Sequence, residues 1–329
     1  ADFATDQDVR WCPGCGDYAI LAAVQKMMSK LPVRKEDHVF VSGIGCSSRF
    51  PYYMNTYGFH TIHGRAPAFA SGLKATNPNL HVWLVTGDGD SLSIGGNHLI
   101  HLLRRNFNLT VLLFNNRIYG LTKGQYSPTS EVGKRTKSSP MGSLDHPFNP
   151  LSLALGADAS FVARTFDVDA KHLTQTLQAA WEHKGTGFIE ILQNCNIFND
   201  ATFADVTDKA NRPTAQLRLE AGEPMLFDGG TKGIVFKDGR PEVVTVGDGG
   251  VNVSDVAIHT PDDHDPSRAF TLGRFVRPDF PVPMGVLRRV ERPTYDDEMT
   301  AQVDEARASR PADLHAMLHS GYTWTVDEE

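Results

Sequence analysis

The sequence predicts an α/β fold, a doubly wound parallel sheet with helices on both faces. Short apolar runs of strand length alternate along the chain with longer segments whose apolar residues recur at helical spacing. These runs lack polar alternation, which indicates strands buried on both faces, and some of them end in glycine-rich turns. In such sheets, ligands collect at the carboxyl ends of the strands.

The first elements follow this alternation. Residues 16–30 repeat apolar side chains at three- and four-residue intervals and predict a helix. The run 39–41 predicts a short buried strand that leads into a glycine-bracketed loop around Cys46. Residues 66–75 are rich in small side chains, so we expect a helix packed closely against the sheet.

The alternation continues through the centre of the chain. Residues 115–148 interrupt it with a long irregular segment rich in Gly, Ser, Thr and Pro. A loop of this length inside a compact domain is usually functional or a lid. Around it we expect strands and helices in turn over residues 82–85, 92–105, 109–114, 170–181 and 188–192.

The pattern of apolar runs and turn residues changes near residue 200. We expect an α/β domain over residues 1–200 and a C-terminal extension over residues 201–329, packed on the core or on a partner subunit. The extension carries short apolar runs separated by turn signals, which predict small hairpins. These turn signals are at residues 228–230, 237–241 and 247–250.

Composition excludes several functional classes. The net charge of -7 over 329 residues argues against a nucleic-acid footprint, which needs a concentrated positive face. No apolar run approaches the ~20 residues that span a bilayer. The N-terminal residues do not resemble a signal peptide, so we expect a cytoplasmic protein. Four cysteines are too few for a disulfide-built secreted scaffold.

One motif carries oxygen ligands for a divalent cation. Gly87-Asp88-Gly89 follows a predicted strand, and Asn115-Asn116 follows the next one. A diphosphate needs close backbone approach and a hard cation such as Mg²⁺, which prefers carboxylate, amide and carbonyl oxygens. A bare Gly-Asp-Gly is weak evidence, because residues 247–249 repeat it where a hairpin turn explains it. The first copy, with its asparagine pair, resembles the diphosphate-binding half of thiamine-diphosphate enzymes.

The cysteines form the second motif. Cys12 and Cys15 make a C-x-x-C, whereas Cys46 and Cys195 are isolated along the chain. Four thiolates suit Zn²⁺ or a [4Fe–4S] cluster. Structural zinc usually uses two local C-x-x-C knuckles, so this spread favours a cluster assembled only after folding. Unrelated buried thiols and a zinc site remain the alternatives.

Together the motifs resemble the beta subunits of 2-oxoacid:ferredoxin oxidoreductases, over roughly residues 11–200. Residues 281–288 and 292–296 also resemble the tail of the 2-oxoglutarate type. The segments that carry the main resemblance are residues 11–16, 43–49, 62–66, 87–90 and 115–125.

The resemblance implies cofactors and their ligands. Cys12, Cys15, Cys46 and Cys195 would hold one [4Fe–4S] cluster. Mg²⁺ would be bound by Asp88, Asn116 and the carbonyl of Ile118. Residues implied to contact thiamine diphosphate or its metal are Gly45, Cys46, Ser47, His63, Gly87, Asp88, Gly89, Asp90, Asn116, Ile118, Gly120, Leu121 and Thr122.

The resemblance also implies a reaction and partners. Such an enzyme couples oxidative decarboxylation of a 2-oxoacid, or the reverse carboxylation, to ferredoxin, and passes the acyl group to coenzyme A. The pyrimidine-binding domain would belong to an alpha-type subunit, in an α2β2 complex. We expect this chain to be inactive alone.

Four further side chains are candidates for catalysis or substrate binding. His63 and Arg65 resemble cofactor or substrate contacts, with a hydrogen-bonded loop histidine as the alternative. Arg49 and Lys123 are candidates for binding a second carboxylate, which favours 2-oxoglutarate, with surface ion pairs as the alternative.

Three other functions compete with this one. The same chemistry could act on pyruvate or another 2-oxoacid. A non-redox thiamine-diphosphate decarboxylase subunit would bind zinc or nothing at its cysteines. A non-catalytic iron–sulfur or zinc scaffold would bind partners through residues 115–148.

Overall fold

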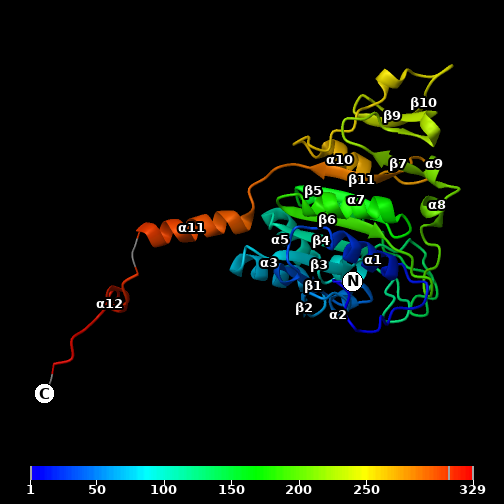
Figure 1. Cartoon of the computed structure of the whole chain (residues 1–329). Coiled ribbons are helices and arrows are strands. Elements are labelled where there is room, and N and C mark those ends of the chain that lie inside the picture. The colour runs from blue at the N-terminus through cyan, green and yellow to red at the C-terminus, as the bar shows by residue number, and fades with distance from the viewer. Residues whose placement is uncertain (1, 310–311, 328–329) are drawn as a thin grey trace.

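The computed structural model describes residues 2–309 and 312–327. They form an eight-stranded sheet in the order β2-β1-β3-β4-β6-β5-β11-β7 (Figure 1). Every neighbouring pair is parallel except β5 and β11. Its strands are β1 (His38–Ser42), β2 (Tyr57–His60), β3 (His81–Gly87), β4 (Leu109–Asn115), β5 (Phe161–Phe166), β6 (Thr186–Leu192), β7 (Gln216–Leu219) and β11 (Val282–Arg289).

Helices cover both faces of this sheet, which confirms the doubly wound α/β prediction. On β3, Val82 and Leu84 join the cluster on the side of α3, α5, α6 and α10, whereas Trp83 and Val85 face α1, α2 and α7. These helices are α1 (Asp17–Met28), α2 (Phe50–Tyr53), α3 (Ala66–Thr76), α5 (Gly96–Arg105), α6 (Pro150–Gly156), α7 (Ala170–Trp181) and α10 (Ser267–Gly273).

The helix predicted over residues 92–105 is present but begins later, at Gly96, because residues 93–95 separate it from a short preceding helix. α4 (Asp88–Leu92) starts inside the Gly-Asp-Gly motif, and the backbone of Ser93 is not helical before α5 begins. The break brings Gly95 against Gly64 so closely that a Cβ on Gly64 would lie 2.6 Å from the Gly95 backbone nitrogen and collide with it. This long-range contact, which local propensity does not encode, fixes the loop that carries His63.

The region beyond residue 200 is more regular than expected. It supplies β7 and β11 to the main sheet, so residues on both sides of the proposed boundary share one sheet. The division at residue 200 stays a prediction. The predicted hairpin near residues 237–241 is present between β9 and β10. The remaining elements are β8 (Leu226–Phe227), β9 (Lys232–Lys237), β10 (Arg240–Thr245), α8 (Ala204–Thr207) and α9 (Arg212–Ala215).

The C-terminal helices α11 (Tyr295–Ser309) and α12 (Leu314–Leu318) extend away from the sheet (Figure 1). In the part of the chain that the structure describes, no helix is long and apolar enough to cross a bilayer.

A buried polar junction attaches the segment before α11 to the core. The Nδ2 group of Asn106 donates to the carbonyls of Arg292 and Pro293, and its Oδ1 accepts from the Ser160 hydroxyl at 2.5 Å. The ring nitrogen Nε2 of His183 lies 2.8 Å from the same hydroxyl. Burial, and then Arg289, lower the pKa of His183 to about 4. The imidazole is therefore neutral in the folded protein at pH 7.

We expect this histidine to make the folded protein less stable as the pH falls. An unfolded histidine titrates near pH 6.5. Between about pH 6.5 and 4, His183 therefore binds a proton in the unfolded chain but stays neutral in the folded protein. His183→Gln keeps a donor for Ser160 but cannot titrate. The variant should therefore lose roughly 1 kcal/mol less stability per pH unit in this window. Denaturant unfolding at several pH values measures this, with exposed His146→Gln as the control. Equal slopes in the parent and His183→Gln would contradict the assignment.

Candidate functional site

Four adjacent parallel strands deliver their following loops to one edge of the sheet. The segments after β1, β3, β4 and β6 begin at residues 43, 88, 116 and 193. The first three of these segments, together with His63, line a cavity of about 470 Å³, and every residue predicted to contact the cofactor lines it. The lining also includes residues that sequence reasoning missed, namely Asp17, Ile44, Phe114, Tyr119 and Gln125.

Asp88 lies almost fully buried at the floor of this cavity. Its Oδ2 atom accepts hydrogen bonds from the hydroxyls of Ser127, at 2.6 Å, and Thr129, at 2.5 Å. Burial raises the pKa of Asp88, and the two hydroxyl bonds oppose this shift. Because both hydroxyls reach the same oxygen, they orient the carboxylate with Oδ1 left for another ligand.

Asn116 and Ile118 bring further oxygens to the cavity. The Nδ2 group of Asn116 donates to Gln193 Oε1 at 2.8 Å, which sets the orientation of the amide, and its Oδ1 accepts from the Ile118 backbone at 3.2 Å. A carboxylate, an amide oxygen and a main-chain carbonyl are the donor types that Mg²⁺ prefers. The residues present therefore fit a magnesium site.

His63 is held by Asp90. The carboxylate oxygen Oδ1 of Asp90 accepts from His63 Nδ1 at 2.5 Å and from the Gly64 backbone at 2.8 Å. Its Oδ2 accepts from the Thr86 hydroxyl at 2.9 Å. With Nδ1 engaged, the imidazole has Nε2 available to hold or move a proton at the cavity.

The three other candidate side chains do not line the cavity. Arg65 Nη1 lies 2.6 Å from His98 Nε2, and Arg49 donates to the carbonyl of Arg10. Lys123 is exposed, on backbone with φ of 74°. Their roles in catalysis and substrate binding stay predictions.

The cysteines gather beside the cavity. A Cβ on Gly120 would lie 3.5 Å from Cys195 Sγ and 3.6 Å from Cys46 Sγ, so glycine leaves open space next to both sulfurs. Burial raises the pKa of the Cys15 thiol, and the nearby Asp17, Cys195 and Cys46 raise it further. Burial, with Asp17, Cys195 and Cys12 nearby, raises the pKa of Cys46 to about 12. The four thiols are unpaired.

No group of three or more His, Cys, Asp or Glu side chains is close enough to hold one metal ion within residues 2–309 and 312–327. A [4Fe–4S] cluster binds each thiolate to a different iron, so its sulfurs are spread around the cluster rather than around one ion. Convergent thiols around open space fit a cluster better than a preformed zinc site.

Gln193 connects the cysteines to the metal-type ligands. Its Nε2 group donates to Cys15 Sγ at 3.3 Å, while its Oε1 accepts from Asn116. Sequence reasoning missed this residue, although a glutamine two positions before Cys195, at the end of an apolar strand, was a visible signal. It also missed Ser127 and Thr129, which stand out as hydroxyls clustered in the long loop.

Comparisons with known proteins agree with this geometry. The model of the thiamine pyrophosphate enzyme C-terminal TPP-binding domain matches residues 43–191. The 2-oxoglutarate oxidoreductase subunit KorB of Mycobacterium tuberculosis is 55% identical, over 99% of this chain and 88% of its own length. The 2-oxoacid:ferredoxin oxidoreductase 1 subunit beta of Aeropyrum pernix is 48% identical, over 62% of this chain and 64% of its own.

A solved structure extends the similarity to the whole fold. The 2-oxoglutarate:ferredoxin oxidoreductase from Magnetococcus marinus, solved with 2-oxoglutarate, coenzyme A and succinyl-CoA bound, matches with a TM-score of 0.77 and 31% identity. The match covers 97% of this chain and 94% of that one.

We expect Gly89→Ala to destabilise the protein. A methyl group on Gly89 would collide with the ring of Tyr119, whose hydroxyl donates to the Gly89 carbonyl at 3.0 Å. Overpacking of this kind costs about 1–3 kcal/mol. Thermal unfolding should show a lower Tm, partly restored in Gly89→Ala/Tyr119→Leu. Gly96→Ala, where nothing lies within 4 Å of the added methyl group, is the matched control and should not lower the Tm. An unchanged Tm for Gly89→Ala would show that the ring moves freely.

Proposed function

Because this chain belongs to the family of 2-oxoacid:ferredoxin oxidoreductase beta subunits, we propose that it serves a thiamine-diphosphate-dependent 2-oxoglutarate:ferredoxin oxidoreductase. The reaction converts 2-oxoglutarate and coenzyme A into succinyl-CoA and CO₂, and two electrons pass to ferredoxin. The same machinery run backwards carboxylates succinyl-CoA. The observation that carries the proposal is that Cys46 both lines the cavity of Asp88 and lies among the gathered thiols.

Asp88, Asn116 and the carbonyl of Ile118 would hold Mg²⁺, and the glycines around them would let a diphosphate approach the backbone. When bound, thiamine diphosphate supplies the carbanion chemistry that breaks the bond between the keto carbon and the carboxylate of a 2-oxoacid. Ile44 and Leu121 add two apolar side chains to the lining of the cavity. His63 holds or moves a proton at Nε2, oriented by Asp90.

Cys12, Cys15, Cys46 and Cys195 would each supply one thiolate to a single [4Fe–4S] cluster, which provides one-electron transfer when bound. Their convergence beside the cavity supports a short electron path out of the site. Hydrogen bonds to cluster sulfurs tune the reduction potential, and Gln193 is placed to make one at Cys15.

The companion pyrimidine-binding domain would come from an alpha-type subunit, in an α2β2 complex. The described residues build the site on one main sheet, and we assign the second domain of this kind to the alpha-type subunit. Arg49 and Lys123 would bind the distal carboxylate of 2-oxoglutarate from outside the cavity lining, and Arg65 would contact cofactor or substrate. We propose the cytoplasm as the compartment, because unpaired thiols and a ferredoxin-linked reaction require reducing conditions.

Low-temperature EPR of the anaerobically purified complex tests this function. We expect a reduced-cluster signal when 2-oxoglutarate and coenzyme A are added together. A signal with dithionite but not with 2-oxoglutarate would retain the oxidoreductase and overturn the substrate. No iron signal under either treatment would exclude the cluster and leave a non-redox decarboxylase.

Cys195→Ser tests the cluster ligands separately from the thiamine site. We expect the variant complex to lose most of its iron and its reduced-cluster signal, while it still retains thiamine diphosphate with Mg²⁺. Ser48→Ala is the matched control, since it removes a buried hydroxyl for which the described residues offer no partner. Full iron content in Cys195→Ser would contradict the ligand set.

A further inference from the structure

Polar side chains form a row across three adjacent strands of the sheet. Arg164 on β5 is directly opposite Glu190 on β6, and Leu113 on β4 is opposite the same glutamate. Asn115 comes two residues after Leu113 and therefore points to the same face. In three strands that carry no other charged side chain, the row places a buried charge pair and an amide next to one another.

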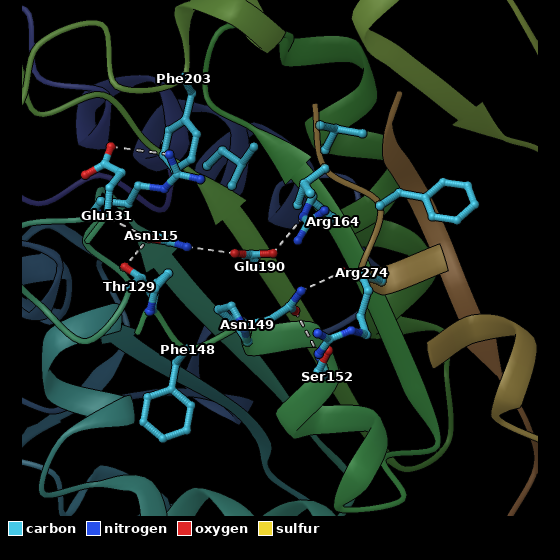
Figure 2. Close-up of a pocket in the computed structure, with 18 of the residues that line it drawn as sticks. Asn115, Thr129, Glu131, Phe148, Asn149, Ser152, Arg164, Glu190, Phe203 and Arg274 are labelled. Carbon is cyan, nitrogen blue, oxygen red and sulfur yellow. Dashed lines mark hydrogen bonds and ion pairs between the residues drawn. The ribbon is translucent and has the colours of Figure 1, made fainter. Parts of the chain in front are cut away.

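The contacts along this row are short and specific. Glu190 is 1% exposed and Arg164 is 7% exposed. The Nε group of Arg164 donates to Glu190 Oε2 at 2.7 Å, and the Nδ2 group of Asn115 donates to Glu190 Oε1 at 2.7 Å. Figure 2 shows the three side chains in line along one wall of a cavity of about 900 Å³.

The row continues into the predicted magnesium site. Thr129 Oγ1 lies 2.9 Å from Asn115 Oδ1 and 2.5 Å from Asp88 Oδ2, so the amide oxygen and the carboxylate share its single hydroxyl proton. Asn115 Oδ1 also accepts from the Arg117 backbone at 3.2 Å, which leaves the amide little freedom to turn. An unbroken series of contacts therefore joins Arg164 to Asp88.

We propose that Glu190 is a positioning residue for the divalent cation, acting through Asn115 and Thr129 on the Asp88 carboxylate. The inference rests on the proposed function, which makes Asp88 a magnesium ligand. Partners of this kind orient metal ligands, and their loss typically lowers metal affinity 10- to 100-fold.

The chemistry of Glu190 explains why a carboxylate is needed. Donors face it from both sides, and a carboxylate offers an acceptor oxygen to each of them. A glutamine has one acceptor oxygen, so it can satisfy Arg164 or Asn115 but not both. A buried ion pair adds little net stability compared with apolar residues of similar size. Orientation of Asn115 is therefore the better account of this pair.

The test is the Mg²⁺ dependence of thiamine-diphosphate retention by the complete complex after rapid desalting. We expect Glu190→Gln to raise the Mg²⁺ concentration for half-maximal retention roughly tenfold. In Arg164→Met/Glu190→Gln the glutamine oxygen is free for Asn115, so the half-maximal concentration should return to within about threefold of the parent. A merely structural role of Glu190 would lower the amount of folded complex without shifting the Mg²⁺ concentration for half-maximal retention.

Thr129→Val keeps the test decisive if Glu190→Gln folds poorly. It removes the hydroxyl from Asp88 without burying a charge, and we expect at least a tenfold shift. Thr110→Val, the same change in a buried part of β4 away from the row, should leave retention unchanged. Combining Glu190→Gln with Thr129→Val should give a shift no larger than Thr129→Val alone, because both break one series of contacts.

Three results would overturn the proposal. The first is a half-maximal Mg²⁺ concentration in Glu190→Gln or Thr129→Val equal to that of the parent. The second is a double variant whose shift is the product of the two single shifts. The third is no recovery of the half-maximal Mg²⁺ concentration when Arg164→Met is added to Glu190→Gln. If the parent complex retains thiamine diphosphate without Mg²⁺, or not at all, the proposed cofactor site fails and the inference fails with it.

Discussion

The parallel pairing of β1, β3, β4 and β6 is the constraint on which the rest of the site depends. Parallel strands end at the same edge, so the segments that follow them meet although they are far apart in the sequence. Cys46, Asp88, Asn116 and Cys195 each follow one of these strands within a few residues. A shift of one residue in the pairing of any of them would turn its side chains to the other face and scatter the ligands.

Two polar side chains from β6 and its following loop support this edge from opposite sides. Glu190 reaches Asp88 through Asn115 and Thr129, whereas Gln193 contacts both Asn116 and Cys15. This strand and the residue that follows it therefore connect the oxygen groups around Asp88 to the thiols. Because Gln193 is almost fully buried, its contacts are shielded from water and strengthen in the low-dielectric interior.

Much of this arrangement can be predicted from the sequence. The parts that cannot be predicted depend on contacts between residues that are far apart in the chain. Apolar runs such as residues 109–114 are long enough to predict buried strands, and the glycine and asparagine motifs then fall at their carboxyl ends. β11 was missed because its charged and proline residues hide a strand whose partners are about 70 and 120 residues away. Glu190 looked like an ordinary strand residue, since its role depends on neighbours that only tertiary structure supplies.

The structure explains why a glycine is needed at position 43, in the loop that carries Cys46. A side chain on Gly43 would collide with the carboxylate of Asp90, the same group that holds His63 and the Gly64 backbone. Asp90 therefore packs one loop through its glycine and orients the other through its histidine. The loop that carries Cys46 and the loop that carries His63 are fixed against one buried carboxylate. A change at Asp90 should thus disturb both loops together, even though Gly95 also packs against Gly64 and the Trp11 indole donates to the Cys46 carbonyl at 2.7 Å.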